Sequence, residues 1–156
     1  MQKATQFLGF SLLRFSLFQF FPLLFILLVC RPLWAQEPLY TPKPSSAERS
    51  AILDSLRAAV QKELKKPVTF KVEQLKVQGS WAFMHGVPLQ PNGKRMNYRD
   101  TPYQEAIEQG MFDDWICALL QKRQGRWRTV TYSLGATDVP YLDWSRKYQA
   151  PSALFR

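Results

Sequence analysis

The residue best suited to acid–base chemistry is His85, the only histidine of the 156-residue chain. A histidine beside a carboxylate can act as a general base, because imidazole titrates near neutral pH and the carboxylate orients it. Asp114 alternates in phase with Ile116 and Leu120, and His85 with Trp81. If these strand faces line one pocket, His85 and Asp114 form a base and its orienting carboxylate. The structural alternative is that His85 lies at the solvent-exposed end of the core and that Asp114 is a solvated residue where a strand begins.

The longer motifs that define enzyme and metal sites are absent from the sequence. It has no Gly-rich phosphate loop, no His-Glu-x-x-His, no Cys-x-x-Cys, no calcium loop and no Gly-x-Ser-x-Gly. One histidine and scattered acids do not form a preferred metal-ligand set. We therefore expect no metal and no cofactor.

Two groups of basic residues are candidates for binding an anion. One surrounds the last predicted hairpin and contains Lys122, Arg123, Arg126 and Arg128; the other lies in the long connection before it and contains Lys94, Arg95 and Arg99. Such surfaces attract anionic lipid, peptidoglycan or nucleic acid. Nucleic acid is not expected, because no recognition-helix or RNP-like pattern is present. The structural alternative is that these side chains are solvated and keep sheet edges from pairing.

Tryptophans are the other candidate ligand-binding residues. Trp81, Trp115 and Trp127 fall on predicted strands and Trp144 in the tail, and their aromatic faces can form a platform for a ligand. The same spacing is typical of residues that fill a core or cover a sheet. Cys117, in an apolar run, is expected to be a small core residue, because no basic neighbour would lower the pKa of its thiol.

A helix is expected where the folded domain begins. Ser45-Ser-Ala-Glu48 has the pattern of a capping box, in which the Ser45 hydroxyl accepts from an amide three residues on and Glu48 reaches back. Pro67 ends the helix. Between them, apolar residues recur every four positions, which predicts one buried helix face: Ile52, Leu56, Val60 and Leu64.

Four antiparallel strands are expected to follow. They are residues 68–77, 81–87, 112–120 and 126–134, with turns at Gly79-Ser80 and Gln124-Gly125. The first strand changes its alternation near Glu73-Gln74, which predicts a β-bulge. Residues 88–109 form a long polar connection with a turn at Pro91-Asn-Gly93. The C-terminal tail is too apolar to be loose and is expected to pack back on the domain.

One amphipathic helix followed by four antiparallel strands predicts an α+β domain over residues 45–156. We expect the helix to lie across the concave face of a curved sheet. This arrangement is similar to the cystatin/NTF2-like group of folds, in architecture only. In that arrangement His85 faces the concave, helix-covered side, where a pocket would open.

Residues 1–35 have the pattern of a secretory signal peptide that would form a signal helix. They contain three basic residues and no acidic one, with an almost wholly apolar run from Phe15 to Cys30. Cleavage is expected after Ala35, and the proline-rich residues 36–44 are expected to be a linker. Cleavage would lower the formal charge from +9 to +6 and leave Cys117 without a disulfide partner.

Two alternatives remain open for this leader. It could stay as an uncleaved anchor, although Gln19 and Pro22 interrupt the apolar run and about 20 apolar residues are needed to span a bilayer. Cys30 could also be lipidated, although Val29 stands where the lipoprotein motif has a smaller residue. All three interpretations export the rest of the chain. Contact with the membrane is expected only through the leader, if it is uncleaved.

Several segments of the domain resemble small, uncharacterised exported proteins of Gram-negative bacteria. The resemblance runs from Ser46 to the C-terminus, and Ser80 stands where those proteins are expected to have Asp. It implies a periplasmic location and a single α+β domain, and it implies no reaction. The segments that carry it are Gly79–Phe83, Phe112–Asp114, Trp127–Val130 and, above all, Gly135–Trp144.

The leading functional hypothesis is a non-catalytic periplasmic binding or accessory domain that contacts a cell-envelope component or a protein. One alternative is a small NTF2-like pocket enzyme that uses His85 and Asp114. A further alternative is a membrane-anchored accessory subunit whose uncleaved leader packs on a partner.

Overall fold

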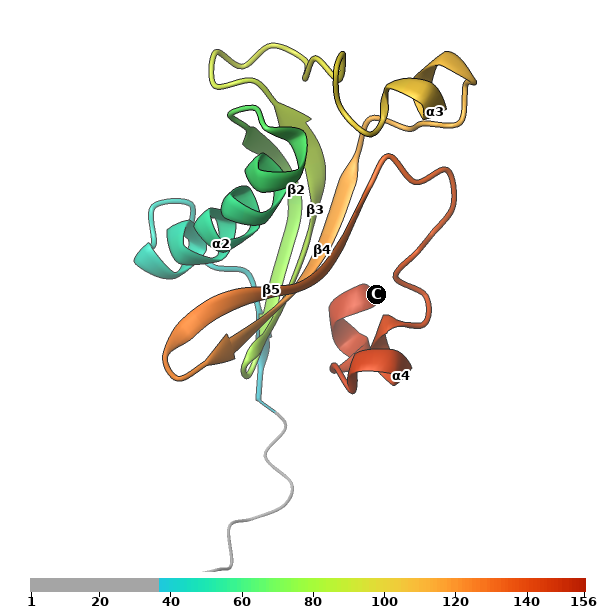
Figure 1. Ribbon diagram of the computed structural model, residues 1–156. Coiled ribbons are helices and arrows are strands. Elements are labelled where there is room, and N and C mark those ends of the chain that lie inside the picture. The colour runs from blue at the N-terminus through green and yellow to red at the C-terminus, as the bar shows by residue number, and fades with distance from the viewer. Residues whose placement is uncertain (1–36) are drawn as a thin grey trace, which may run out of the picture. The chain divides into compact units, whose positions relative to one another are not determined.

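The computed structural model describes residues 37–156, in which one long helix packs on one face of an antiparallel sheet (Figure 1). The predictions on the leader, including its cleavage and Cys30, lie outside the described residues. Residues 37–156 form one compact unit. The predicted α+β class is confirmed in this form: a helix on an open sheet of five strands, one of them short.

The helix, α2, spans Ala47–Leu64 and buries the predicted face. Its N-cap is Ser46 and not Ser45, because the Ser46 hydroxyl accepts from the backbone N–H of Arg49 at 3.2 Å. Glu48 does not complete a capping box. Its carboxylate accepts a hydrogen bond from Tyr40 at 2.8 Å instead. The helix ends at Lys65, whose left-handed φ of 54° turns the chain toward Pro67.

The sheet has its strands in sequence order, each antiparallel to the next. They are β1 (Leu39–Tyr40), β2 (Thr69–Gln78), β3 (Trp81–Leu89), β4 (Ile116–Arg123) and β5 (Arg126–Leu134). The last strand has the bounds that the sequence predicted.

The first strand corrects the interpretation of residues 36–44 as a linker. Leu39 and Tyr40 pair with the edge of β2, and Pro42 is buried. The prolines of this segment do not disturb the pairing, because Pro38 and Pro42 flank β1 and lie outside it. The folded unit therefore begins at Glu37 and not at Ser45.

The predicted bulge in β2 is confirmed. The register of β2 against β3 shifts between Val72 and Gln74, so that Glu73 is the extra residue. Opposite the bulge, a Cβ on Gly86 would lie 2.3 Å from the carbonyl oxygen of Lys71. Glycine is therefore required at position 86 by the close approach of two backbones.

The fourth strand starts later than predicted, at Ile116 and not at Phe112. Residues 112–115 form a turn, in which the N–H of Trp115 donates to the Asp113 carbonyl at 2.8 Å. Before this turn, a short helix, α3 (Gln104–Glu108), interrupts the long connection. The predicted turn at Pro91–Gly93 is present and closes a small bridge between Leu89 and Arg95.

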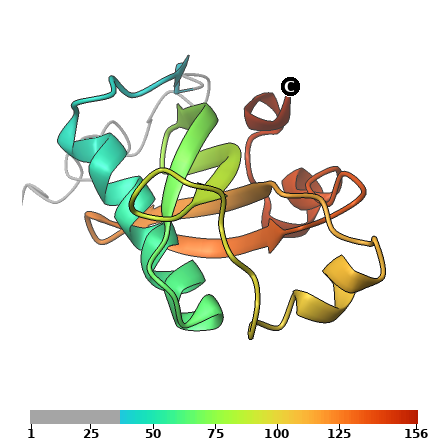
Figure 2. The same cartoon turned by 90° about the horizontal axis from the view of Figure 1, so that it is seen from above.

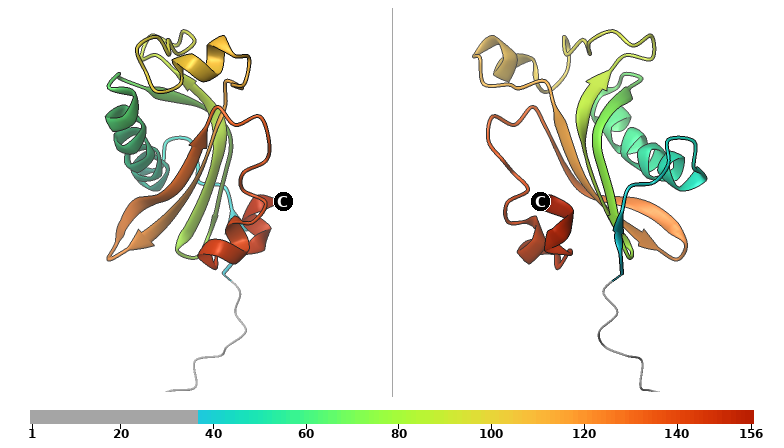
Figure 3. Two further views of the ribbon diagram at one scale, coloured as in Figure 1. Left: turned by 45° about the vertical axis from the view of Figure 1, so that its right-hand side comes forward. Right: turned by 180° about the vertical axis from the view of Figure 1, so that it is seen from behind.

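The sheet is covered on both faces, as Figures 2 and 3 show. On one face α2 packs against residues that include Leu75, Met84 and Leu120. On the other face lie two short C-terminal helices, α4 (Trp144–Tyr148) and η1 (Ser152–Phe155), packed on Phe83 and Leu119. The prediction that the tail packs back on the domain is confirmed.

Replacing Gly135 should test how tightly the turn before β4 is packed. Gly135 has φ +77°, and a Cβ there would lie 2.1 Å from the ring of Phe112. In Gly93→Ala, at φ +79° with nothing within 4 Å of the added Cβ, only backbone strain of about 1–2 kcal/mol is expected. Gly135→Ala should lose about 1–3 kcal/mol more in urea unfolding, because the ring must also move. Equal losses for the two variants would show that Phe112 is not packed as described.

Candidate functional site

His85 lies on the face of the sheet opposite to the one predicted. It alternates in phase with Phe83, as expected, but Phe83 belongs to the core under the C-terminal helices and not to the core under α2. The His85 ring lies 5.1 Å from that of Trp115, centroid to centroid. Its Nδ1 is 3.3 Å from the Glu73 carboxylate, and the His85 side chain is 29% exposed. The bulge in β2 thus supplies the carboxylate beside the histidine.

Asp114 is held by other partners. It accepts a hydrogen bond from the hydroxyl of Tyr98 at 2.8 Å, and Arg95 Nε lies 3.6 Å from its second oxygen. Among residues 37–156, no hydrogen bond or ion pair joins Asp114 to His85. The two residues therefore do not form the base and orienting carboxylate of the sequence-based hypothesis.

Cys117 is fully buried beneath the C-terminal helices, as predicted. Burial in apolar surroundings raises the pKa of its thiol to about 12. A thiol with that pKa is protonated at neutral pH, so Cys117 is not a nucleophile.

A group of tyrosines and carboxylates lies where the long connection meets α2 and β5. Tyr103 donates to one Glu63 oxygen at 2.6 Å, and Tyr132 donates to the other. Tyr98 packs edge-on against Phe112, with ring centroids 4.7 Å apart. Beside them is an open cavity of about 470 Å³, lined chiefly by the connection and α3. These contacts tie residues 96–115 to the rest of the domain.

Burial is the main reason why the pKa values of these tyrosines are raised. For Tyr98, Tyr103 and Tyr132, desolvation disfavours the phenolate, and hydrogen bonds to Asp114 or Glu63 add to the effect. The hydroxyls are therefore neutral donors, and the carboxylates accept from them.

A second open groove, of about 560 Å³, lies between α2 and β5. Its helix side is made of small residues, and its strand side includes Trp127 between Arg126 and Arg128. Ser55 links the two sides of the groove, because its hydroxyl accepts a hydrogen bond from the backbone N–H of Thr129 at 2.9 Å. The small helix residues are Ala51, Ser55, Ala58 and Ala59.

Trp127 is one of the tryptophans that the sequence names as candidates, but its place beside this groove was not predicted. Its ring is buried, Lys122 Nζ lies 5.7 Å from the ring centroid, and its Nε1 has no hydrogen-bond partner within residues 37–156. The available signal was the run of small residues on one face of α2, which leaves room beside a strand.

The basic residues of the β4–β5 hairpin differ in how they are paired. Lys122 lies 3.8 Å from Glu48, and Arg123 donates to the Gln121 side chain at 2.7 Å. Within residues 37–156, no carboxylate lies within 4 Å of Arg126 or Arg128. We call Lys122, Arg123, Arg126 and Arg128 the basic hairpin.

The candidate tryptophans Trp81 and Trp115 pack at the margin of the core under the C-terminal helices.

Residues 37–156 contain no cluster of three or more potential metal-ligating side chains, and no helix among them is long and apolar enough to cross a membrane. Comparison of the chain with protein-family models, with curated proteins and with solved structures found no match.

The stability of the domain should fall at alkaline pH. An unfolded tyrosine titrates near pH 10, and the folded pKa values of Tyr98, Tyr103 and Tyr132 are higher. Their contribution is therefore fully present below pH 10 and is lost as the pH rises above it, at about 1.4 kcal/mol per pH unit for each group. Urea unfolding between pH 7 and 11 measures this loss. The slope should be shallower in Tyr98→Phe, and an identical slope would contradict the assignment.

Proposed function

We propose that this chain is an exported, non-catalytic binding domain that acts at the cell envelope and binds an anionic partner. The binding surface is the basic hairpin together with the groove between α2 and β5. The observation that carries the proposal is that Arg126 and Arg128 flank this groove without a carboxylate partner in the described domain.

The electrostatics of this surface support an anionic partner. Exposed guanidinium groups without a neighbouring carboxylate attract anions and can hold a carboxylate or phosphate through two parallel hydrogen bonds. Lys122 is engaged with Glu48 and with the Trp127 ring, so it supports the surface more than it contacts a ligand.

The architecture supports a binding domain of the cystatin/NTF2-like kind. A single helix follows the first strand, and the remaining strands form a sequential antiparallel sheet beneath it. This likeness concerns architecture and carries no activity. The pocket-enzyme alternative gains no support from the geometry, because Asp114 and His85 have separate partners.

Two variants with the same net charge test the proposal. In Arg126→Glu/Arg128→Glu the charge of two residues of the basic hairpin is reversed. In the control, Lys94→Glu/Arg99→Glu, the charge of two exposed residues at the other end of the domain is reversed. The exported protein, purified from a Gram-negative host, is bound to a heparin column and eluted with salt. We expect the hairpin variant to elute at clearly lower salt than the control variant, because the contact is local and screened.

Elution of both variants at the same salt concentration would mean that only net charge matters, and the basic hairpin would not be a binding surface. Export is tested separately with the full chain. Protease should degrade the domain in spheroplasts and leave it intact in whole cells; degradation in neither would overturn the envelope location.

A further inference from the structure

We propose that the partner of the basic hairpin is the anionic lipid surface of the membrane to which the leader directs the chain. The domain would rest on this surface with the β4–β5 hairpin down and α3 away from it. This inference rests on the proposed function, and it names the lipid headgroup layer as the anion.

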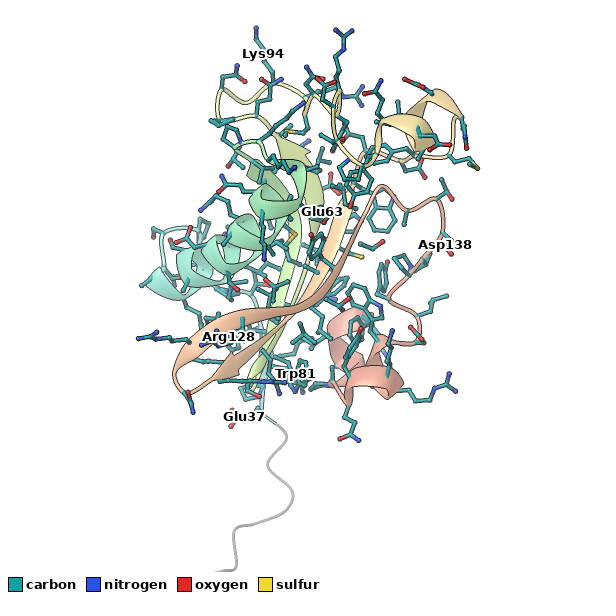
Figure 4. The ribbon with its side chains drawn as sticks, in the orientation of Figure 1. Glu37, Glu63, Trp81, Lys94, Arg128 and Asp138 are labelled. Atoms are coloured by element: carbon teal, nitrogen blue, oxygen red, sulfur yellow. The ribbon has the colours of Figure 1, made fainter. Side chains whose placement is uncertain are left out.

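The register of the sheet places the hairpin and the start of the domain at the same end. One row of paired residues crosses the whole sheet, and it consists of Leu39, Gln78, Trp81, Gln121 and Arg128. Along the strands from this row toward the β4–β5 turn, Glu37 lies two residues past Leu39. In the same direction, Arg123 lies two residues past Gln121. Glu37 and Arg123 therefore lie at the same level, and Figure 4 shows Glu37 and Arg128 at one end with Lys94 at the other.

Charge is distributed unequally between the two ends. Residues 121–128 contain four basic residues and no acidic one. The opposite end carries both signs of charge: residues 94–114, which precede β4, contain three basic residues and five acidic ones. Near an anionic surface such a domain has one favoured orientation, because the hairpin end is attracted, whereas at the other end the acidic residues offset the basic ones.

The tether between leader and domain is short. The apolar run ends at Cys30, and because residues 39–40 are already a strand, the folded unit begins at Glu37. The six residues between them span at most about 20 Å. An uncleaved leader would thus hold the basic hairpin within reach of the headgroups, where surface charges act over a Debye length of about 8 Å.

The occupant follows from combining these observations. Binding of a soluble polyanion would explain the unpaired basic residues alone. A membrane surface also explains why these residues lie at the end of the domain where the chain enters it from the leader. If the leader is cleaved, the same end still binds through charge alone, at about 1 kcal/mol per basic residue near the surface.

The test places a fluorophore at either end of the exported protein. Nitrobenzoxadiazole is attached to Gln124→Cys at the hairpin tip or, as a matched control, to Gln109→Cys beside α3. Cys30→Ser removes the leader thiol, and Cys117 is buried. Each protein is mixed with, or reconstituted into, vesicles of two parts phosphatidylcholine to one part phosphatidylglycerol that carry a headgroup nitroxide quencher.

We expect the label at position 124 to be quenched at least about twofold more strongly than the label at position 109. The difference should disappear in vesicles of phosphatidylcholine alone, in high salt and in Arg126→Glu/Arg128→Glu, and it should persist in Lys94→Glu/Arg99→Glu. Equal quenching at both positions overturns the inference. If the hairpin-dependent retention on heparin is nevertheless observed, the proposed anion-binding function stands and only the lipid assignment fails.

Discussion

The β-bulge in β2 is the constraint on which the rest of the fold depends. The apolar residues of this strand occupy even positions before Glu73 and odd positions after it, so a regular strand would turn half of them away from α2. The extra residue keeps all of them under the helix and adds twist to the sheet. It also draws Lys71 so close to β3 that only glycine fits at position 86.

Because the apolar residues of β4 face both ways, both faces of the sheet need a cover. The helix α2 supplies one and the C-terminal helices supply the other, and each cover completes its own core. Covered faces leave little room for a ligand on the sheet itself. The open cavities therefore lie at the margins, beside the long connection at one end and between α2 and β5.

For binding, the positions of the charged residues matter more than the net charge of the protein. At one end, carboxylates are engaged by tyrosine hydroxyls and by Arg95, in contacts that hold the connection in place. At the other end, Arg126 and Arg128 have no such partner in the described domain. The first arrangement contributes to stability, and the second leaves charge available for binding.

The sequence by itself determined the elements that depend on neighbouring residues. The buried face of α2, the bounds of β5 and the bulge at Glu73 follow from periodicity and turn chemistry within a few positions. The strand β1 could not be predicted in this way, because two residues become a strand only when a distant edge is there to pair with them. The tertiary structure alone also decided which face His85 occupies. Alternation says which residues share a side of a strand, but only packing decides which side the helix covers.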